Sequence, residues 1–215
     1  MNFIQEHLQR GDYTGWFDKI YTNADGDGST IPWAQLKPRP ALAQWLEKAR
    51  PDGRGKRAAV IGCGLGDDAE ALATYNFDVT GFDISPTAVE WCHERFPDSQ
   101  VSYQVADLFN PPAEWLGGFD FIVECYTVQA LPIEIRKTVV GHVVDLVAPD
   151  GTLLVVTIGV GEEDERSGPP WPLTRTEVDY FSELGLHEVE FEQLPKRTEQ
   201  GRALWRVEYR LGIHF

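Results

Sequence analysis

Short apolar runs alternate with segments of helical periodicity through the middle of the chain. The apolar runs predict buried strands at residues 57–61, 77–82, 101–105, 119–125 and 151–158. Between and after these runs, the pattern predicts helices at residues 66–74, 86–95, 132–147 and 174–184. Strands and helices that alternate in this way predict a parallel sheet covered by helices on both faces.

Single residues sharpen several of these boundaries. Ser85 is the expected N-cap of the helix that begins at Pro86, and Gly185 is expected to end the last helix. The sequence Pro149-Asp150-Gly151 predicts a turn that leads into the fifth strand. Pro40 is expected to precede a helix that ends near Lys48.

The two ends of the chain have different patterns. The first forty residues predict short helices at residues 2–10 and 13–21, followed by a turn-rich loop. At the other end, residues 186–194 and 203–211 predict two strands joined by a loop at residues 195–201. Apolar and polar residues alternate in the final strand, so we expect an antiparallel pair in which this strand has one face in water.

Candidate chemistry is found where the predicted strands end. The first strand ends in Gly62-Cys63-Gly64-Leu65-Gly66, a sequence that allows a tight turn and lets a ligand approach bare backbone. The helix that follows adds unpaired N–H groups and the positive end of a dipole. Asp83 ends the second strand, where an acidic side chain can hold both hydroxyls of a ribose. Asp107 follows the third strand and is placed to accept from an adenine amino group, so the set predicts a site for an adenosine-type ligand.

A nicotinamide-dependent oxidoreductase is the first alternative. The glycines of such enzymes have the spacing G-x-G-x-x-G, whereas this chain has G-x-G-x-G. A dehydrogenase also needs a second region for its substrate and proton donor, and a chain of 215 residues leaves little room for one. The terminal antiparallel strand pair is likewise unexpected in the plain dinucleotide-binding fold, so this alternative is the less favoured one.

With this glycine turn, Asp83, Asp107 and a final strand hairpin, the chain from Arg57 to its end resembles the class I S-adenosylmethionine (SAM)-dependent methyltransferases. The resemblance implies an α/β, doubly wound, Rossmann-like sheet of seven mostly parallel strands, with the last strand antiparallel. It implies SAM as cofactor and S-adenosylhomocysteine as product, with glycines at the methionine end, Asp83 on the ribose and Asp107 at the adenine. The residues that it places at the cofactor are Gly62, Cys63, Gly64, Gly66, Asp68, Asp83, Ile84, Asp107, Leu108 and Glu124.

A narrower resemblance concerns three other segments. Ile31-Pro32-Trp33-Ala34-Gln35-Leu36-Lys37-Pro38-Arg39-Pro40-Ala41-Leu42 is similar to the N-terminal cap of the thiopurine, thiol and halide methyltransferases. Asp68 after the glycines, Tyr126-Thr127 after the fourth strand and Gly168-Pro169-Pro170-Trp171-Pro172 after the fifth also resemble that group. The acid that methyltransferases usually carry two residues before the first glycine is replaced by Val60, and members of this group often lack it.

The resemblance divides the chain into a small helical cap at residues 1–40 and a SAM-binding methyltransferase domain at residues 41–215. The cap and the loop at residues 168–173 would supply a dry aromatic lid, because a sulfonium loses its charge on methyl transfer and water must be excluded. The expected substrate-pocket residues are Tyr13, Trp16, Trp33, Tyr126 and Trp171. Glu124 and Tyr126 are the candidate catalytic residues, which would orient the acceptor or take its proton.

Composition and charge change the list of partners. The formal net charge is −15 at pH 7, and so acidic a chain repels nucleic-acid phosphates and anionic lipid. We therefore expect a small-molecule acceptor, with neither a nucleic acid nor a membrane as partner. The chain starts without the features of a secretion signal, and its 3 cysteines fit neither a disulfide framework nor a zinc cluster. We expect a cytoplasmic protein without a bound metal; the pattern does not indicate an oligomeric state.

The sequence favours sulfur as the atom that is methylated. No histidine follows a parallel strand end, and Cys63 and Cys125 are better explained as small buried side chains than as nucleophiles. A thiol titrates at about 8.5 and loses its proton with modest help, whereas an alcohol needs a strong base. The hypothesis is SAM-dependent methyl transfer to a small molecule, with a thiol as the favoured acceptor. A non-catalytic SAM-binding module is the second alternative.

Overall fold

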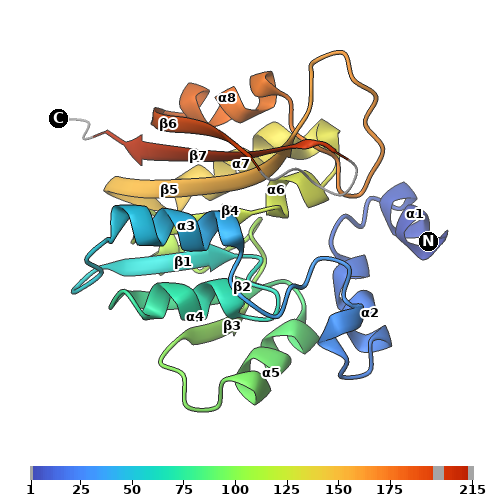
Figure 1. The fold of residues 1–215 in the computed structure, drawn as a ribbon. Helices are drawn as coiled ribbons and strands as arrows, with labels where there is room; N and C mark the ends of the chain where they lie inside the picture. Colours follow the sequence, from blue (N-terminus) through green and yellow to red (C-terminus); the bar gives the residue numbers. More distant parts are fainter. Residues whose placement is uncertain (1, 196–200, 213–215) are drawn as a thin grey trace.

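In residues 2–195 and 201–212, which this computed structural model describes, seven strands form a single sheet (Figure 1). The strands are β1 (Arg57–Ile61), β2 (Asp78–Asp83), β3 (Ser102–Val105), β4 (Phe119–Cys125), β5 (Val147–Gly159), β6 (Leu186–Leu194) and β7 (Ala203–Leu211). Their order across the sheet is β3-β2-β1-β4-β5-β7-β6. Neighbours from β3 to β5 pair in parallel, whereas β7 runs antiparallel to both β5 and β6. The expected fold class is confirmed.

Helices flank this sheet and also precede it. The described helices are α1 (Asn2–Gln9), α2 (Gly15–Asn23), α3 (Pro40–Ala49), α4 (Asp67–Ala73), α5 (Pro86–Arg95), α6 (Thr127–Ala130), α7 (Arg136–Asp145) and α8 (Arg175–Glu183), with 3₁₀ turns η1 (Gly28–Thr30), η2 (Ala113–Trp115) and η3 (Ile133–Ile135). In Figure 1, α1 and α2 lie to one side of the sheet, with α2 next to α5. No helix among the described residues is long and apolar enough to cross a membrane.

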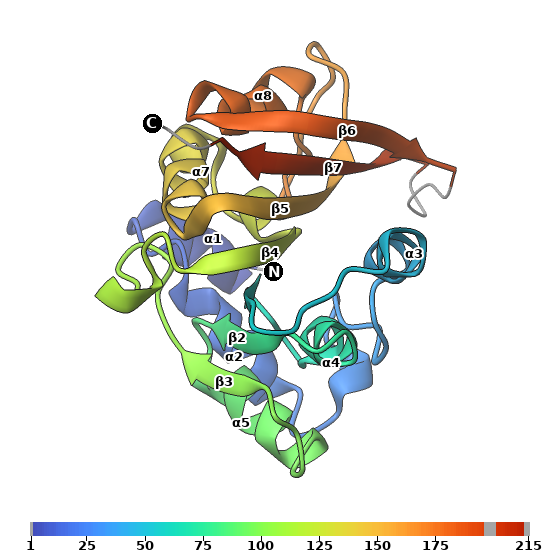
Figure 2. The ribbon, with the colours of Figure 1, turned by 90° about the vertical axis from the view of Figure 1, so that its left-hand side faces the viewer.

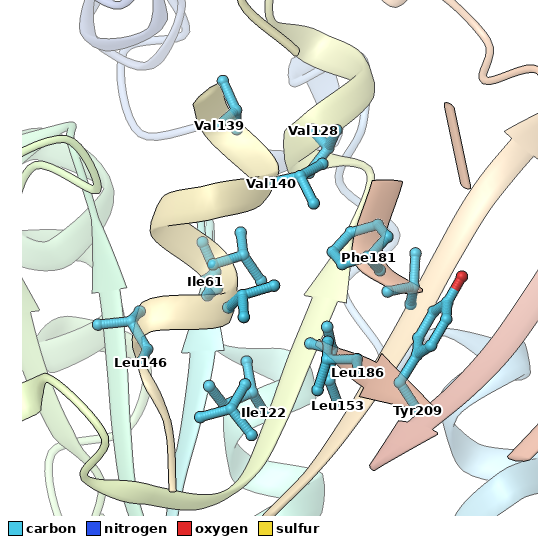
Figure 3. Packing of buried hydrophobic residues seen from close by; sticks show 14 of the residues in the cluster. Ile61, Ile122, Val128, Val139, Val140, Leu146, Leu153, Phe181, Leu186 and Tyr209 are labelled. Carbon is cyan, nitrogen blue, oxygen red and sulfur yellow. The ribbon is translucent and has the colours of Figure 1, made fainter. Parts of the chain in front are cut away.

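Two hydrophobic clusters cover the two faces of the sheet. On one face, side chains of α3, α4 and α5 pack against Ala58 and Val60 of β1; on the other, side chains of α7 and α8 pack against Ala59 and Ile61. Figure 2 shows these helices on opposite sides of the sheet, and Figure 3 shows the second cluster from close by. Alternate residues of one strand thus enter different cores, because successive side chains of a strand point to opposite faces.

Several local signals act as expected. The hydroxyl of Ser85 accepts from the backbone N–H of Ala88 and caps α5. Gly185 follows α8 with φ of +104°, a conformation that glycine adopts easily. Thr174 and Glu177 also form a reciprocal capping box at the start of α8, which was not among the predicted signals. These signals need only a few neighbouring residues, so they can be recognised in the sequence.

The helix expected at residues 132–147 is wrong at both ends. A separate turn of helix, α6, comes first, then η3, and α7 begins only at Arg136. Val147 belongs to β5, where it pairs with Phe119 of β4. Pro149-Asp150-Gly151, where a turn before the strand was expected, lies within β5. Asp150 there has a left-handed conformation with φ of 61°. The long-range pairing of β5 with β4, which extends the strand through this turn, is absent from the local pattern.

The prediction that the final strand has one face in water is wrong at its centre. Arg206 is only 4% exposed, although it occupies a polar position of the alternation. Its guanidinium donates to the carbonyl oxygen of Ala41 at 2.6 Å and to Glu192 at 2.8 Å. Glu208 accepts from the indole of Trp45 at 2.9 Å. Because α3 covers this part of β7, Arg206 is buried and Glu208 is half-buried, and both are paired. Residues 196–200 of the expected loop lie outside the described residues.

Candidate active site

A cavity of about 960 Å³ opens at the carboxyl ends of β1, β2 and β4, where a parallel sheet is expected to bind its ligand. This volume is near the top of the range of roughly 300–1,000 Å³ for small-molecule sites. The cavity is therefore large enough for a nucleoside cofactor together with a second small molecule.

The glycine turn forms part of the cavity wall. Gly62 and Gly64 have φ of +60° and +55°, and both line the cavity together with Cys63. A Cβ atom on Gly62 would lie 2.5 Å from Thr127 Oγ1, so a larger residue would force this wall apart. Gly66 is different, because it precedes α4 and packs on Tyr103 without lining the cavity.

Asp83 braces the glycine turn from below. It is 7% exposed and its two carboxylate oxygens accept from the backbone N–H groups of Gly64 at 3.0 Å and Ser85 at 2.9 Å. Burial raises the pKa of Asp83, and these two hydrogen bonds oppose that shift. Asp83 and its neighbour Ile84 both line the cavity. A carboxylate thus faces the site while its position is fixed by backbone donors.

The end of β3 contributes the next part of the same wall. Asp107 and Leu108 line the cavity, as expected from the sequence. The carboxylate of Asp107 accepts from the backbone N–H of Phe109 at 2.9 Å, which closes a tight turn. The other carboxylate oxygen of Asp107 is not used in this turn, and the next residue, Leu108, is apolar. Together they suit a ligand that has both a polar edge and a flat apolar surface.

Asp68 and Arg39 join this wall to the segment before α3. Asp68 accepts from the backbone N–H of Arg39 at 2.7 Å, and burial raises the pKa of Asp68 to about 6. The Arg39 guanidinium donates to the carbonyl oxygen of Trp33 at 2.6 Å and lies 4.7 Å from the centre of the Tyr126 ring. Arg39 lines the cavity and was not among the expected site residues. It lies in the segment at residues 31–42, which the resemblance singled out as a whole.

The two candidate catalytic residues lie differently. Tyr126 lines the cavity in a left-handed conformation with φ of 67°, which is uncommon for a bulky residue and is often found at functional sites. Glu124 is 1% exposed and does not line the cavity. Its Oε1 accepts from the backbone N–H of Val128 at 2.9 Å, while its Oε2 has no partner among the described residues. Burial raises the pKa of Glu124 to about 7. Glu124 thus supports α6 through Val128 and lies outside the cavity wall.

The expected aromatic wall is present in part. Trp16 and Trp33 line the cavity, whereas Tyr13 and Trp171 do not. Tyr13 supports the wall through its carbonyl oxygen, which accepts from the Trp16 indole at 3.0 Å. Phe17, stacked on Trp16 with ring centres 3.8 Å apart, lines the cavity although the sequence did not single it out.

The start of the chain is tied to the sheet domain at one end of α5. Asp18 of α2 accepts from the hydroxyl of Ser85 at 2.6 Å and from the backbone N–H of Thr87 at 3.1 Å. These contacts place a carboxylate at the positive end of a helix, which is favourable. The aromatic side chains of α2 are thereby held over the cavity.

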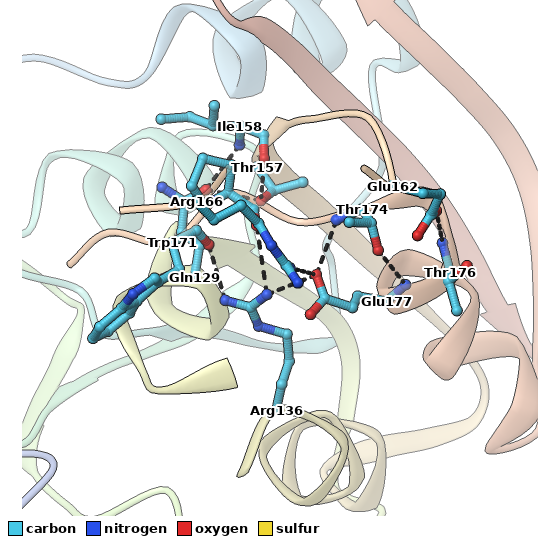
Figure 4. Close-up of polar contacts among 11 residues, drawn as sticks. Gln129, Arg136, Thr157, Ile158, Glu162, Arg166, Trp171, Thr174, Thr176 and Glu177 are labelled. Atoms are coloured by element: carbon cyan, nitrogen blue, oxygen red, sulfur yellow. Dashed lines mark hydrogen bonds and ion pairs between the residues drawn. The ribbon is translucent and has the colours of Figure 1, made fainter. Parts of the chain in front are cut away.

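A buried ion-pair network fixes the loop at residues 161–172 (Figure 4). Arg136 is 0% exposed and donates to Glu177 at 2.7 Å and to the carbonyl oxygen of Trp171 at 2.9 Å. Arg166 of the loop donates to the same Glu177 oxygen at 2.6 Å. Burial lowers the pKa of Arg136, while Glu177 opposes the shift. Pro169 and Pro170 are thus held in the cavity wall.

Thiols and imidazoles offer no firm nucleophile or base here. Cys63 and Cys125 line the cavity, and all three cysteines, Cys92 included, are free. A hydrogen bond with Cys92 and burial raise the pKa of Cys63, and burial raises that of Cys125, so both favour the neutral thiol. No histidine of the described residues lines the cavity; His214 lies outside them.

A seven-stranded sheet with an antiparallel β7, and a cavity against a glycine turn after β1, are the architecture of a class I SAM-dependent methyltransferase, and this protein is one. The model of the family "Thiopurine S-methyltransferase (TPMT)" matches residues 25–203, and the chain belongs to this family. The narrower resemblance seen in the sequence is therefore confirmed. Neither the oxidoreductase nor the non-catalytic binding module is retained.

Relatives and solved structures agree with this assignment. The chain is 33% identical over 193 residues to a probable thiol methyltransferase 2 from Arabidopsis thaliana, with 84% of this chain and 81% of the relative covered. It is 29% identical over 199 residues to a thiocyanate methyltransferase 1 from Brassica oleracea, with coverage of 90% and 81%. The fold is similar to that of the N-methyltransferase NodS from Bradyrhizobium japonicum, solved with S-adenosylhomocysteine. That comparison has a TM-score of 0.67 and 22% identity, and it covers 90% of this chain and 99% of the other.

The cavity suits SAM, the cofactor of this class. Bare backbone at Gly62 and Gly64 admits a ligand closely, and the carboxylates of Asp83 and Asp107 offer acceptors for hydroxyl and amino groups. The acids on this side also favour a cationic ligand.

Proposed function

We propose that this enzyme methylates the sulfur atom of a small-molecule thiol. SAM supplies a methyl group on a positively charged sulfur, already activated for transfer. The task of the protein is to align the acceptor and to exclude water. The names of the relatives, which include thiol and thiocyanate methyltransferases, support sulfur as the acceptor atom.

The observation that carries the proposal is the lack of a positioned base on the acceptor side. Glu124 does not line the cavity, and no described histidine does. Asp67 and Asp68 line it, but the Asp67 carboxylate is paired with Arg95, and Asp68 Oδ1 accepts from the backbone N–H of Arg39. A hydroxyl or amide acceptor would need a stronger base than these residues provide. A thiol, with a pKa of about 8.5, forms its thiolate with modest help.

We infer the following roles for the cofactor side. Asp83 would accept from both ribose hydroxyls, and Asp107 from the adenine amino group, with Leu108 and Ile84 against the base. Gly62, Cys63 and Gly64 would present backbone to the methionine part. All of these residues line the cavity, which supports the assignment. Gly66 would act indirectly, by allowing the chain to enter α4.

We further propose that residues 1–40 act as a cap over the acceptor and that residues 41–215 bind the cofactor. Trp16, Phe17 and Trp33 in the cavity wall support this division. Tyr126 would orient the acceptor, with the Arg39 guanidinium over its ring. A chain that lacks residues 1–32 should still bind SAM but lose methyl transfer, provided that circular dichroism shows a folded protein. Full turnover by the shortened chain would contradict a role for the cap.

The decisive experiment is an acceptor panel with SAM labelled in its methyl group. Thiols, halides, amines and phenols are compared, and we expect transfer to thiols at a rate that rises with pH along the ionisation of each thiol. Turnover confined to a hydroxyl or a ring nitrogen, with loss of all activity in Tyr126→Phe or Glu124→Gln, would contradict the proposal and reveal a dedicated base.

We also propose a cytoplasmic location and no nucleic-acid partner. Three free cysteines support a reducing compartment. The net charge of −15 disfavours contact with phosphate backbones. Fractionation of cells that express the tagged chain, and a nucleic-acid binding assay at low salt, test the two statements separately.

A further inference from the structure

The side chain of Gln129 is a buried polar group in the cavity wall to which the proposed function assigns no role. Gln129 lies in α6, is 2% exposed and lines the cavity. Its amide oxygen accepts from the backbone N–H of Ile158 and from the hydroxyl of Thr157, both at 2.8 Å (Figure 4). A backbone N–H only donates, so the atom that faces Ile158 must be the amide oxygen. The orientation of the amide is therefore fixed by β5.

This orientation leaves the amide nitrogen without a protein partner. No group of the described residues accepts a hydrogen bond from Gln129 Nε2, which carries two N–H donors. The fully enclosed side-chain polar atoms without a partner, within the described part of the chain, are Glu124 Oε2, Arg136 Nε and Trp205 Nε1. Gln129 Nε2 is not among them, so part of its surface is accessible, and the cavity is the space that its residue lines.

The surroundings of Gln129 place this donor on the acceptor side. The carbonyl oxygen of Gln129 accepts from the backbone N–H of Trp171 at 2.7 Å, which holds the loop with Pro169 and Pro170 next to α6. Three apolar residues near Gln129, namely Ala130 and Leu131 in the sequence and Ile158 at the end of β5, also line the cavity. The wall around the amide is thus mostly apolar, unlike the wall with Asp83 and Asp107. An unpaired donor in such a wall is costly, and a ligand that accepts its hydrogen bond removes that cost.

We propose that Gln129 Nε2 donates a hydrogen bond to the methyl acceptor and selects acceptors that present an anionic or lone-pair atom to it. The inference rests on one part of the proposed function, namely that the acceptor binds between the N-terminal segment and the loop at residues 161–172. A site built to form such a hydrogen bond rejects analogues that lack the matching atom, because its own donor then stays unpaired. Gln129 is a binding and specificity residue, which moves no proton.

The substitution Gln129→Glu tests this role directly. It has nearly the same shape and keeps an oxygen for Ile158 and Thr157, but it replaces the donor that faces the cavity by a second oxygen. At a pH of about 9 we expect kcat/KM for the acceptor to fall 10- to 100-fold, about 1.4–2.7 kcal/mol, mainly through KM. The dissociation constant of SAM should change less than twofold. The loss should shrink as the pH falls, because a protonated carboxyl group again offers a donor.

Two further variants complete the experiment. Gln193→Glu adds the same charge at an exposed position of β6 outside the cavity and should behave like the parent. Gln129→Met removes both polar ends at similar length; it serves if Gln129→Glu does not fold, and it should show the same loss of kcat/KM. A purely structural role would leave Gln129→Glu active, because the oxygen is kept. Parent-like kcat/KM in a folded Gln129 variant, or an equal loss of SAM affinity, would overturn the inference.

The acceptor used is whichever compound the panel shows to be methylated. If that compound is not a thiol, the sulfur proposal fails, while the comparison of Gln129→Glu with the parent still decides the role of Gln129. The two failures are therefore separate results.

Discussion

The cavity has two walls that are built in different ways. The wall with Gly62, Gly64 and Asp83 consists of short segments at the ends of neighbouring parallel strands. The opposite wall takes Trp16 from α2, Arg39 from the segment before α3, Gln129 from α6 and Pro169 from the loop after β5. Each segment of the first wall can be recognised from a few neighbouring residues in the sequence. The second exists only when segments distant in the chain come together.

The two walls are also stabilised differently. Asp83 fixes the first wall by accepting from the backbone N–H of Gly64, which follows the neighbouring strand, and from that of Ser85, two residues further along the chain. The second wall depends on buried charges, since Glu177 holds both Arg136 and Arg166 and so fixes the loop. A buried ion pair costs much when one partner is removed. A substitution in the first wall should therefore affect SAM, and a substitution in the second wall should affect the methyl acceptor.

The largest effect is expected for Glu177→Gln. This change leaves the buried Arg136 guanidinium without its carboxylate, so the free energy of unfolding should fall by about 3–5 kcal/mol. Methyl transfer should fall with the loop, whereas SAM affinity of the folded fraction should stay near that of the parent. Chemical denaturation and calorimetry measure the two quantities. Unchanged stability would show that the network does not hold the second wall.

Asp83→Ala should act on the first wall alone. The loss of hydrogen bonds to a charged group should weaken SAM binding by about 1.5–3 kcal/mol, as measured by calorimetry. Circular dichroism checks that the fold is kept. A loss below about 0.5 kcal/mol would exclude the ribose role, because that is less than a typical hydrogen bond contributes.

Glu124→Gln tests the support beneath α6 through pH. Burial raises the pKa of Glu124 to about 7, above its ordinary value of 4.5, so the folded state holds a proton that the unfolded state has lost. The stability of the parent should therefore fall as the pH rises between these two values. The variant cannot ionise, so it should gain on the order of 1–2 kcal/mol relative to the parent between about pH 5 and about pH 8.

Denaturation of both proteins at the two pH values measures that gain. The methyl-transfer rate of Glu124→Gln should fall without being abolished, because Glu124 does not line the cavity. A stability difference that is independent of pH would mean that Glu124 is ionised in the folded protein throughout.

The smallest effect is expected for Tyr126→Phe. The ring stays in place beneath the Arg39 guanidinium, and only the hydroxyl of this cavity-lining residue is lost. The rate should fall about 3- to 10-fold, equivalent to about 1 kcal/mol, with unchanged SAM affinity. Kinetics at saturating SAM provide the measurement. Complete loss of activity would identify the hydroxyl as an essential base or donor.

Much of the first wall was predictable. The glycine turn after β1 and the acids at the ends of β2 and β3 can be recognised from the residues next to them in the sequence. The structure places Gly62, Asp83 and Asp107 in one cavity. The second wall was predictable only in part. Trp16 and Trp33 are in it, but Tyr13 and Trp171 stand behind it, because a sequence does not tell which side of a loop or helix faces a cavity.

The sequence by itself determined the order of strands and helices, the glycine turn with its acids and the family, because each depends on residues close together in the chain. The tertiary structure decided the rest. It buried Arg206 beneath α3, turned Glu124 away from the cavity and aligned the Gln129 amide against β5. These outcomes depend on which distant segment covers a side chain. Helix caps and turns form from neighbouring residues, whereas burial and hydrogen-bond partners are fixed only when distant segments pack together.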